Sequence, residues 1–257
     1  MVERLSRRDR VRAETTVEIK QTARKILVEE GPDAVTLRAI AREMGMTAPA
    51  LYRYFGSHEE LLQNVAGDIF GELADEIHAA IRAADAATSG DMGEKMAAAC
   101  RGFRQWALGH RAEFGLIFGT PLPGINVEND DFAEECARKF AGTFFTLFGE
   151  LWQKNPFPVP APGKIDPGLR EQLSRYRDGI GADLPLGALL TFLACWVRLY
   201  GIVSMEVFGH LGFALEDAEP MFEITLAELA GMVNLDYRPR SGLGSRVSLS
   251  RSAQSAT

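Results

Sequence analysis

The sequence predicts an all-α protein made of a small N-terminal three-helix unit followed by a larger helical domain. Three observations predict this fold class. Apolar residues recur at helical spacing along most of the 257-residue chain. Capping residues precede many of these segments, and glycine or proline ends them. No segment alternates apolar and polar residues between turn signals, which is the pattern of a β-strand.

The first helical segment carries one apolar stripe and then a stop signal. The stripe consists of Ile19, Ala23, Ile26 and Leu27. Gly31 and Pro32 follow it, and glycine with proline just beyond is typical of a helix C-terminus. We therefore expect the helix to end near Glu30. Ahead of it, residues 1–13 hold five arginines and are expected to form a flexible basic arm.

Residues 36–56, with the sequence TLRAIAREMGMTAPALYRYFG, predict two short helices joined by a tight turn. Thr36 starts the first helix, Gly45 ends it in a left-handed conformation, and Thr47 caps the second. This is the pattern of a helix-turn-helix, whose second helix points its N-terminal residues into the major groove of DNA. The side chains expected to face DNA are Thr47, Ala48, Pro49, Tyr52, Arg53 and Tyr54. For Tyr52, Tyr54 and Phe55, burial in the core is the alternative interpretation.

Charge is divided unevenly along the chain, although the formal net charge is only −7. Residues 1–56 carry 11 Lys and Arg against 8 Asp and Glu, and residues 57–237 carry 13 against 27. Residues 238–257 carry four arginines and no acid. A basic unit can approach a polyanion that the acidic remainder of the chain repels. The distribution therefore favours nucleic acid as a partner of residues 1–56.

The rest of the chain predicts a helical bundle. Ser57 and Glu60 form a capping box that opens a long helix. Residues 155–168 are rich in proline and are expected to form a loop. Residues 237–257 are dominated by serine, glycine and arginine and are expected to be disordered. Further helices are expected at about residues 92–108, 111–118, 131–154, 169–178, 186–211 and 220–235.

The helix-turn-helix segment resembles the DNA-binding signature of the TetR family of bacterial repressors. The matching residues are TLRAIAREMGMTAPALYRYF and the following SHEELL, preceded by Ile19, Ala23 and Gly31. The resemblance implies a homodimer in which residues 14–56 bind DNA and residues 57–236 bind an effector and dimerise. In such proteins a small effector typically releases the dimer from a palindromic operator on double-stranded DNA. A ligand-responsive repressor is the expected function, and a constitutive DNA-binding protein or an activator is the alternative.

The resemblance also implies which residues meet the phosphate backbone. Arg38 lies early in the first helix of the motif and Thr36 at its N-terminus, where phosphate contact is expected. Many family members have lysine where this chain has His58, and that lysine meets a phosphate. A neutral imidazole can still donate one hydrogen bond but brings no charge near pH 7. The basic arm is expected to compensate by reaching a flanking groove or the backbone, and a merely solvated arm is the alternative.

Two segments of the larger domain resemble one subgroup of the same family. The first is FRQWALGHRAEF at residues 103–114. The second is WVRLYG at residues 196–201, where the subgroup has Trp-x3-His-Gly. Tyr200 stands in place of the histidine, so any role tied to an imidazole at this position is lost.

Aromatic residues at helical spacing predict a ligand pocket in the larger domain, because helical bundles often leave a gap that holds a ligand. The predicted lining of this apolar effector site is Phe103, Trp106, Phe114, Phe118, Phe144, Phe148, Trp152 and Trp196. Ser204, Tyr176 or Arg104 would supply polar contacts, and the alternative is that the aromatic side chains form the core. We also expect the middle of the long helix after Ser57 to line the pocket and to swing when ligand binds.

The two C-terminal helices, residues 186–211 and 220–235, are the expected dimer interface. Two such helices from each of two copies would form a symmetric four-helix contact. Small residues in the first helix permit close approach, and the second is more apolar than a lone surface helix requires. Its apolar residues are Met221, Ile224, Leu226, Leu229 and Val233. The alternative is that this pair packs only inside its own subunit.

Several classes of function and site have no signature in the sequence. The four histidines show no metal-ligand spacing, and there is no glycine-rich phosphate loop and no GxSxG, so we expect no enzyme, metal site or cofactor. The three cysteines lie far apart in apolar segments, which indicates free buried thiols in a reducing cytoplasm. The charged N-terminus lacks an apolar core, so we do not expect it to be a signal peptide. The most apolar run, residues 184–197, is shorter than the ~20 residues that span a bilayer, so no membrane contact is expected.

Overall fold

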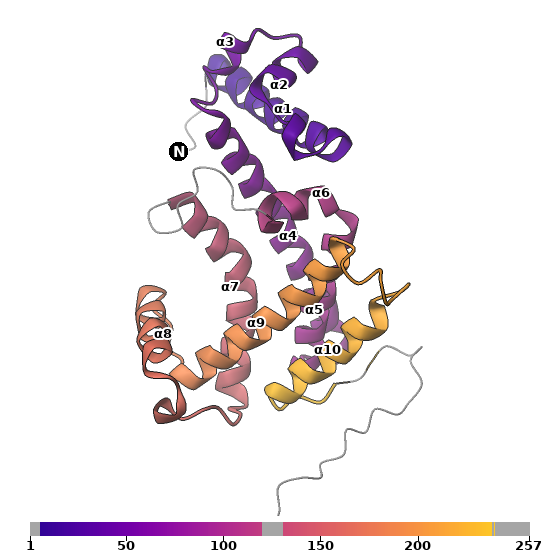
Figure 1. Cartoon of the computed structure of the whole chain (residues 1–257). Helices are drawn as coiled ribbons and strands as arrows, with labels where there is room; N and C mark the ends of the chain where they lie inside the picture. The colour runs from indigo at the N-terminus through magenta and orange to yellow at the C-terminus, as the bar shows by residue number, and fades with distance from the viewer. Residues whose placement is uncertain (1–5, 120–130, 238, 240–257) are drawn as a thin grey trace, which may run out of the picture.

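The computed structural model of the chain describes residues 6–119, 131–237 and 239 (Figure 1). Over these residues the chain consists of α-helices with short 3-10 and π segments, and it contains no β-strand. The prediction of an all-α fold is therefore confirmed. Figure 1 shows two parts joined by the long helix α4: a head formed by α1 to α3 and a body formed by α5 to α10.

The head contains three α-helices and one 3-10 turn. They are α1 (Arg7–Glu30), η1 (Pro32–Ala34), α2 (Leu37–Glu43) and α3 (Ala48–Leu51). Its small core is centred on Ile19, Ile40 and Leu51, all fully buried. α1 ends where Gly31 adopts a φ of 90°, which glycine tolerates because it has no Cβ. The stop signal predicted at this position is confirmed.

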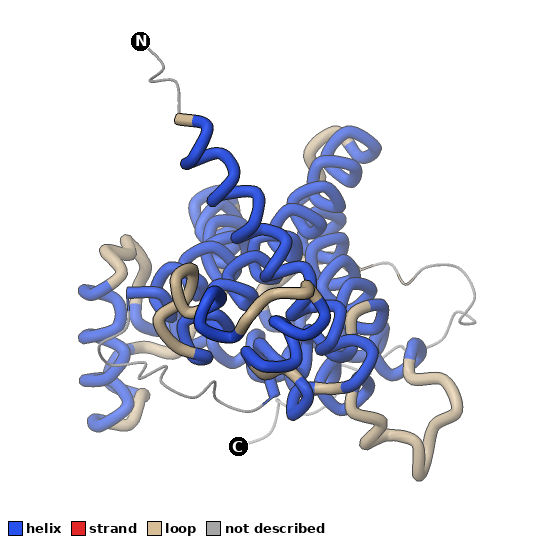
Figure 2. Tube along the Cα trace, turned by 90° about the horizontal axis from the view of Figure 1, so that it is seen from above, coloured by secondary structure: helices blue, strands red, loops and turns tan. Residues whose placement is uncertain are grey.

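The basic arm is shorter than the sequence predicts, because α1 already begins at Arg7. Ser6 caps the helix by accepting a hydrogen bond from the N–H of Asp9 at 3.2 Å. Serine suits an N-cap, an acid suits the first turn, and arginine is a good helix former. The prediction of a flexible arm over residues 1–13 is therefore wrong from Arg7 onward, and residues 1–5 lie outside the described residues. Figure 2 shows the first turns of α1 projecting beyond the other helices.

Helix α4 (His58–Thr88) connects the head to the body (Figure 1). The capping signal at its start is confirmed, since Ser57 accepts a hydrogen bond from the N–H of Glu60 at 3.0 Å. The Glu60 carboxylate in turn accepts from the N–H of Gly56 at 2.6 Å. The buried face of α4 runs from Leu61, near the head, to Ile77 in the body. One helix therefore contributes to both cores.

Within the residues that the structure describes, the body contains six further α-helices. They are α5 (Met92–Gly109), α6 (Arg111–Phe114), α7 (Asp131–Lys154), α8 (Pro167–Gly179), α9 (Leu186–Val207) and α10 (Glu219–Met232). A π-helical turn, η2 (Gly115–Gly119), follows α6, and a 3-10 turn, η3 (Pro162–Lys164), lies in the predicted proline-rich loop. α5 and α7 pack along α4, while α9 packs against α5, α8 and α10 (Figure 1).

Helix α9 is the most apolar helix of the body and ends earlier than predicted. Its length and composition would allow it to cross a membrane, but 44% of its most apolar stretch is buried in the fold, as in a helix that packs in a core. It stops at Val207 because Gly209 has a φ of 73° and the His210 N–H returns to the Met205 carbonyl at 2.7 Å. α10 likewise stops at Met232, short of residue 235.

Candidate nucleic-acid interface and effector cavity

The turn between α2 and α3 has the backbone geometry that the sequence predicts, but the Thr47 side chain, at the N-cap position of α3, makes no capping hydrogen bond, so that part of the prediction is wrong. Gly45 adopts a φ of 64°, and the N–H of Met46 donates to the Ala41 carbonyl at 2.8 Å. Thr36 caps α2 by accepting from the N–H of Ala39 at 3.1 Å. Because the buried face of α3 packs on α2, its opposite face is left open, which is the arrangement a helix-turn-helix needs to reach a major groove.

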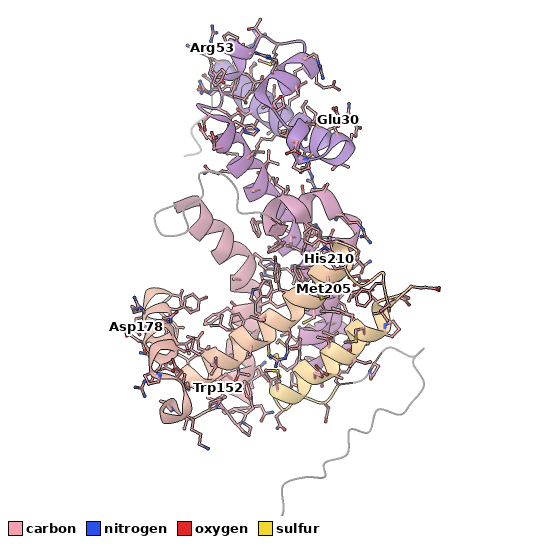
Figure 3. The ribbon with its side chains drawn as sticks, viewed as in Figure 1. Glu30, Arg53, Trp152, Asp178, Met205 and His210 are labelled. Carbon is pink, nitrogen blue, oxygen red and sulfur yellow. The ribbon has the colours of Figure 1, made fainter. Side chains whose placement is uncertain are left out.

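Most of the side chains predicted to face DNA are exposed on the head. The exposed ones are Thr36, Arg38, Thr47, Pro49, Tyr52 and Arg53. Arg53 lies at the end of the molecule farthest from the body (Figure 3). Ala48 and Tyr54 are half-buried. Small residues at the start of α3 permit close approach to base edges, and the arginines and Tyr52 are suited to donate to phosphates or bases.

Tyr54 belongs partly to the core of the head and partly to a contact with α1. Its ring packs against buried core residues, and the guanidinium of Arg12 lies 5.7 Å from the ring centroid. Arg12 also donates to the Arg53 carbonyl at 2.9 Å. Phe55 is buried, so the core interpretation holds for it. These contacts fix the first turns of α1 beside the C-terminal end of α3.

His58 is hydrogen-bonded to the backbone of the head. Its Nε2 lies 2.5 Å from the Val35 carbonyl oxygen, and because a carbonyl can only accept, Nε2 carries the proton. The ring therefore ties the start of α4 to the segment before α2. The phosphate contact that the family resemblance implies for His58 is left to Nδ1, and it stays a prediction.

Most of the aromatic residues predicted to line a pocket pack on one another. The ring centroids of this aromatic cluster lie 4.9–6.5 Å apart. Its members are Phe70, Phe103, Phe114, Phe118, Phe140, Phe144, Trp196 and Tyr200. Outside it, Trp106 stacks on His110 at 4.9 Å, and Trp152 meets Phe157 edge-on at 5.1 Å. Rings thus fill the centre of the body.

An apolar cavity of about 70 Å³ lies beside the aromatic cluster, between α5, α7, α9 and α10. The predicted residues that line it are Phe144, Phe148 and Trp196. The other predicted residues do not line the cavity. They are Phe103, Trp106, Phe114, Phe118 and Trp152, together with the polar candidates Arg104, Tyr176 and Ser204. No residue of α4 lines this cavity, so the lining expected from the middle of α4 is not found there.

The inner face of α10 supplies a wall of the cavity that sequence reasoning missed. Leu226 and Leu229 of α10, and Val233 directly after its end, line the cavity and are buried within their own subunit. The spacing of these apolar residues along the sequence is compatible both with a cavity wall and with the dimer interface that the sequence analysis predicts for this helix. For these three residues the alternative interpretation of packing inside the subunit is correct, whereas Met221 and Ile224 of the same helix are exposed.

Two thiols line this cavity from α5 and α9. Burial raises the pKa of Cys100 to about 12 and that of Cys195 to about 11, so both remain protonated near neutral pH. A protonated buried thiol behaves as a small apolar surface and a poor nucleophile. Both are free cysteines, as expected, while the Cys136 side chain lies outside what the structure describes. Within the described part of the chain, no group of His, Cys, Asp and Glu is arranged to hold a metal ion.

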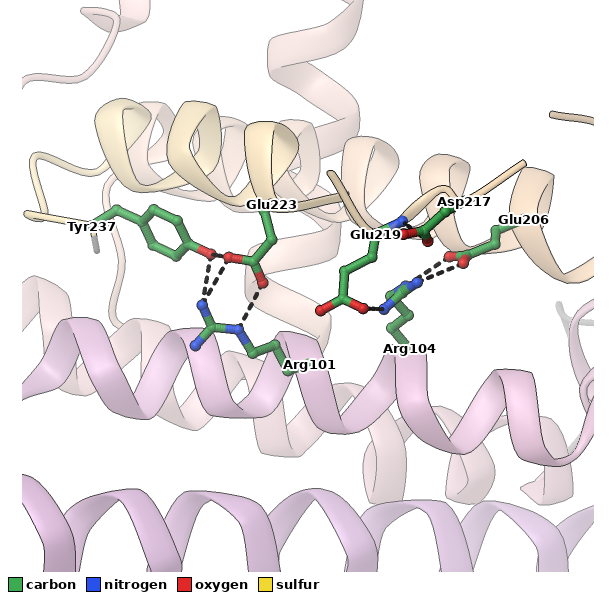
Figure 4. Close-up of polar contacts among 7 residues, drawn as sticks. All are labelled: Arg101, Arg104, Glu206, Asp217, Glu219, Glu223 and Tyr237. Atoms are coloured by element: carbon green, nitrogen blue, oxygen red, sulfur yellow. Dashed lines mark hydrogen bonds and ion pairs between the residues drawn. The ribbon is translucent and has the colours of Figure 1, made fainter. Parts of the chain in front are cut away.

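Two arginines of α5 hold the last two helices of the body through largely buried ion pairs (Figure 4). Arg101 donates to the two carboxylate oxygens of Glu223 on α10 at 2.9 and 3.0 Å. Arg104 donates to those of Glu206 on α9 at 2.7 and 2.6 Å. The hydrogen bonds to Glu206 raise the pKa of Arg104 above its usual value. Bidentate pairs of this kind fix helices in register as well as neutralising charge.

Arg24 of α1 links the head to the body through helix α6. It donates to Glu72 of α4 at 2.5 Å and to Glu113 of α6 at 3.3 Å, and Glu113 is buried. Two residues before Glu113, Arg111 donates to the Val207 carbonyl at the end of α9, at 2.7 Å. Helix α6 therefore contacts both the head and the end of α9.

Comparisons with known proteins match both parts of the chain. The family described as bacterial regulatory proteins, tetR family, matches residues 19–65, and the tetracyclin repressor-like C-terminal domain matches residues 96–229. HTH-type transcriptional regulator Rv1816 of Mycobacterium tuberculosis is 28% identical over 209 residues, which cover 81% of this chain and 87% of the relative. HTH-type transcriptional regulator BetI of Rhizobium meliloti is 37% identical over 62 residues, 24% of this chain and 30% of BetI.

Solved structures show the same arrangement. The crystal structure of SCO4313 has a TM-score of 0.66 and 31% identity, covering 88% of this chain and all of that one. RolR, solved in complex with resorcinol, has a TM-score of 0.53 and 16% identity, covering 92% of this chain and all of RolR. The matched curated relatives are transcriptional regulators and not enzymes. The chain therefore belongs to the TetR family, and it is a transcriptional regulator with a DNA-binding helix-turn-helix.

Proposed function

We propose that this regulator is a homodimeric cytoplasmic repressor that binds a palindromic operator and is released by a small apolar effector. One observation carries the proposal: the helices that wall the cavity, α9 and α10, also present exposed apolar residues on their outer side. The same two helices can therefore contact a ligand on one face and a second copy of the chain on the other. A ligand that moves them would alter the relative position of two heads.

The outer face of α9 and α10 supports the dimer. Its exposed apolar residues are Val197 and Met205 on α9, with Met221 and Ile224 on α10. Val197, Gly201 and Met205 follow one another at four-residue spacing and so lie on one side of the helix. Gly201 at the middle of this stripe permits a partner helix to approach closely. Exposed apolar residues on two neighbouring helices favour an interaction site there.

The coupling to DNA would run from α9 through α6 to α1. A cavity of about 70 Å³ is smaller than the roughly 300–1,000 Å³ of most ligand sites, so an effector would push its walls apart. The Arg111 contact would pass a shift of the end of α9 to α6, and the pair of Glu113 with Arg24 would pass it to the head. Two heads with altered spacing no longer fit successive major grooves, and operator and effector then weaken each other's binding by the same factor.

Selection of bound DNA from a random pool, with the full-length protein, tests the operator and the dimer together. We expect a palindrome whose half-sites are about one helical turn apart or slightly more. Light scattering at micromolar concentration should give the mass of two chains. A selected site without twofold symmetry, or a particle with the mass of one chain, would contradict the proposal.

A thermal-shift screen of apolar compounds tests the effector. A compound that binds the folded protein raises its stability by RT ln(1 + [L]/Kd), and the same compound should lower operator affinity. Ala230→Phe, which puts a ring into the cavity, should abolish both effects. Ala86→Phe, at an exposed position near the end of α4, is the matched control and should retain both. Stabilising compounds that leave operator affinity unchanged would show that the regulator is not released by an effector.

A further inference from the structure

The chain reverses direction after α10 and returns along the body. Asn234 adopts a left-handed conformation with a φ of 54°, and the N–H of Leu235 donates to the Ala230 carbonyl at 2.9 Å. This hydrogen bond across a left-handed residue is a common helix C-terminal motif. It directs residues 233–237, which we call the strap, back over the cavity.

The strap forms one wall of the cavity and packs against the start of α5. Val233, Leu235 and Tyr237 line the cavity together with Asp236. The Asp236 carbonyl oxygen lies so near Gly93 that a Cβ at this glycine would be only 3.0 Å from it. Glycine at position 93 therefore lets the strap lie close to the helix. The other walls belong to α5, α7, α9 and α10, so the strap is the wall that is not helical.

Tyr237 fastens the strap through a three-residue network (Figure 4). Its hydroxyl donates to the Glu223 carboxylate and accepts from Nη2 of Arg101 at 2.8 Å. The Arg101 guanidinium also lies 5.5 Å from the centroid of the tyrosine ring. Burial raises the pKa of the Tyr237 hydroxyl, so it stays protonated and able to donate across the neutral range. Loss of this hydroxyl would remove two hydrogen bonds that hold the strap to α5 and α10.

The network also decides which charge the cavity accepts. The side chains that line the cavity are apolar apart from two protonated thiols, the hydroxyl of Tyr237 and the exposed Asp236. The nearby cation, Arg101, is already held by both oxygens of the Glu223 carboxylate. An anionic ligand would therefore have to lose its hydration without gaining a free cationic partner, which is strongly unfavourable. A neutral apolar ligand avoids this penalty.

We propose that the cavity selects an uncharged apolar molecule, which enters by lifting the strap, and that Glu223 enforces the selection by keeping Arg101 neutralised. The inference rests on the proposed function, because it concerns the same cavity. It adds the charge class of the ligand, the path of entry and the roles of Glu223 and Tyr237.

Two fluorescent probes with the same aromatic core test the charge selection on the wild-type protein. N-phenyl-1-naphthylamine is neutral, and 8-anilino-1-naphthalenesulfonate carries a sulfonate. We expect the neutral probe to bind at least tenfold more tightly and Ala230→Phe to abolish its binding. Equal affinity for the two probes, or no binding of the neutral probe, would overturn the selection without requiring any variant to fold.

Glu223→Gln then tests the assigned residue. Because it frees Arg101 to pair with a sulfonate, it should raise the affinity for the anionic probe at least tenfold and leave the neutral probe within twofold. The double variant Arg101→Met, Glu223→Met replaces the pair with apolar side chains of similar size and should again exclude the anion. Helical circular dichroism confirms that each variant is folded. Unchanged probe preference in folded Glu223→Gln would overturn the role of Glu223.

Stopped-flow binding of the neutral probe tests the entrance. Tyr237→Phe keeps the ring but loses the fastening hydroxyl, and we expect association to become several-fold faster. Tyr200→Phe is the matched control, since it also removes one tyrosine hydroxyl. That hydroxyl donates to the Phe118 carbonyl at 2.6 Å and does not contact the strap. Wild-type rates in both variants would place the entrance elsewhere. Operator release is measured separately: bound probe without release contradicts the proposed function and leaves this inference standing.

Discussion

The head and the body use arginine in opposite ways. Arg38 and Arg53 of the head are exposed beside the helix-turn-helix. Arg101 and Arg104 of the body are largely buried, and each is held by a carboxylate. A cation that meets the phosphates of DNA has to remain accessible, because its neutralisation and the release of counterions occur on binding. A cation that joins helices has to be neutralised inside the protein, because an unpaired buried charge is costly.

Two ion pairs of nearly equal length make the comparison quantitative. Lys25 and Glu43 in the head lie 2.7 Å apart with side chains about half exposed, at 53% and 50%. Arg104 and Glu206 in the body lie 2.6 Å apart with side chains 15% and 12% exposed. An exposed pair is screened by water and contributes little. The two contact distances are nearly the same, so the difference in burial decides what the removal of one partner costs.

The largest effect is expected from Glu206→Ala. The substitution leaves Arg104 largely buried, with the exposed Glu219 carboxylate at 3.9 Å and the Phe222 ring, whose centroid lies 5.1 Å from the guanidinium, as remaining partners. Breaking a buried pair on one side costs about 3 kcal/mol, which lowers the melting temperature of a chain of this size by roughly 6–12 °C. Glu228→Ala, at an exposed position of α10, is the control and should melt like the wild type. Differential scanning calorimetry makes the measurement, and equal melting of the two variants would break the comparison.

A smaller effect is expected at the DNA end of the molecule, from Arg8→Ala. Arg8 precedes Arg12 by four residues and so lies on the same face of α1, which Arg12 fixes beside α3. Arg10 lies on another side of the same exposed turns. Arg8→Ala should weaken operator binding several-fold and reduce the slope of log K against log salt by about 0.9, the value for one phosphate contact.

Arg10→Ala is the matched control for that measurement and should keep the wild-type affinity and slope in a fluorescence-anisotropy titration. Point substitutions suit this test better than deletion of residues 1–12, because the deletion would also remove the first turns of α1 and the contact of Arg12 with Arg53. If the slope of log K against log salt falls by the same amount in both variants, the first turns of α1 act as diffuse positive charge and not through one face of the helix.

The head was predictable because its signals are local. Thr36, Gly45 and Ser57 each act on neighbours within four or five residues, and the structure places each in its predicted role as cap or turn. The prediction for the start of α1 is wrong because the five arginines suggest a flexible arm, whereas Ser6 and Asp9 form a helix cap. A cap of this kind also acts locally, so the signal was present in the sequence.

The cavity was predictable only in part because its lining depends on distant contacts. Helical spacing puts Phe103 and Phe148 equally on inner faces, yet Phe103 is enclosed by other rings and Phe148 lines the cavity. The last residue of the strap, Tyr237, falls in the segment that the sequence analysis predicts to be disordered, residues 237–257. That boundary is wrong, since Tyr237 is held by Arg101, 136 residues earlier in the chain. No local pattern encodes such a contact, and residues 240–257 lie outside the described part.

The smallest effect on stability is expected from Lys25→Ala, which removes the exposed pair of the head. The hydrogen bond from Lys25 lowers the pKa of Glu43, so the pair stabilises the fold above the carboxyl's usual pKa and loses that contribution as pH falls through the lowered value. In Lys25→Ala the pKa of Glu43, followed by NMR, should return toward its ordinary range, whereas Lys25→Arg should keep it low. The melting temperature at pH 7 should change by no more than about 1 °C. A loss as large as that of Glu206→Ala would show that burial is not what separates the two pairs, and a Glu43 pKa that does not move would show that the contact does not persist in solution.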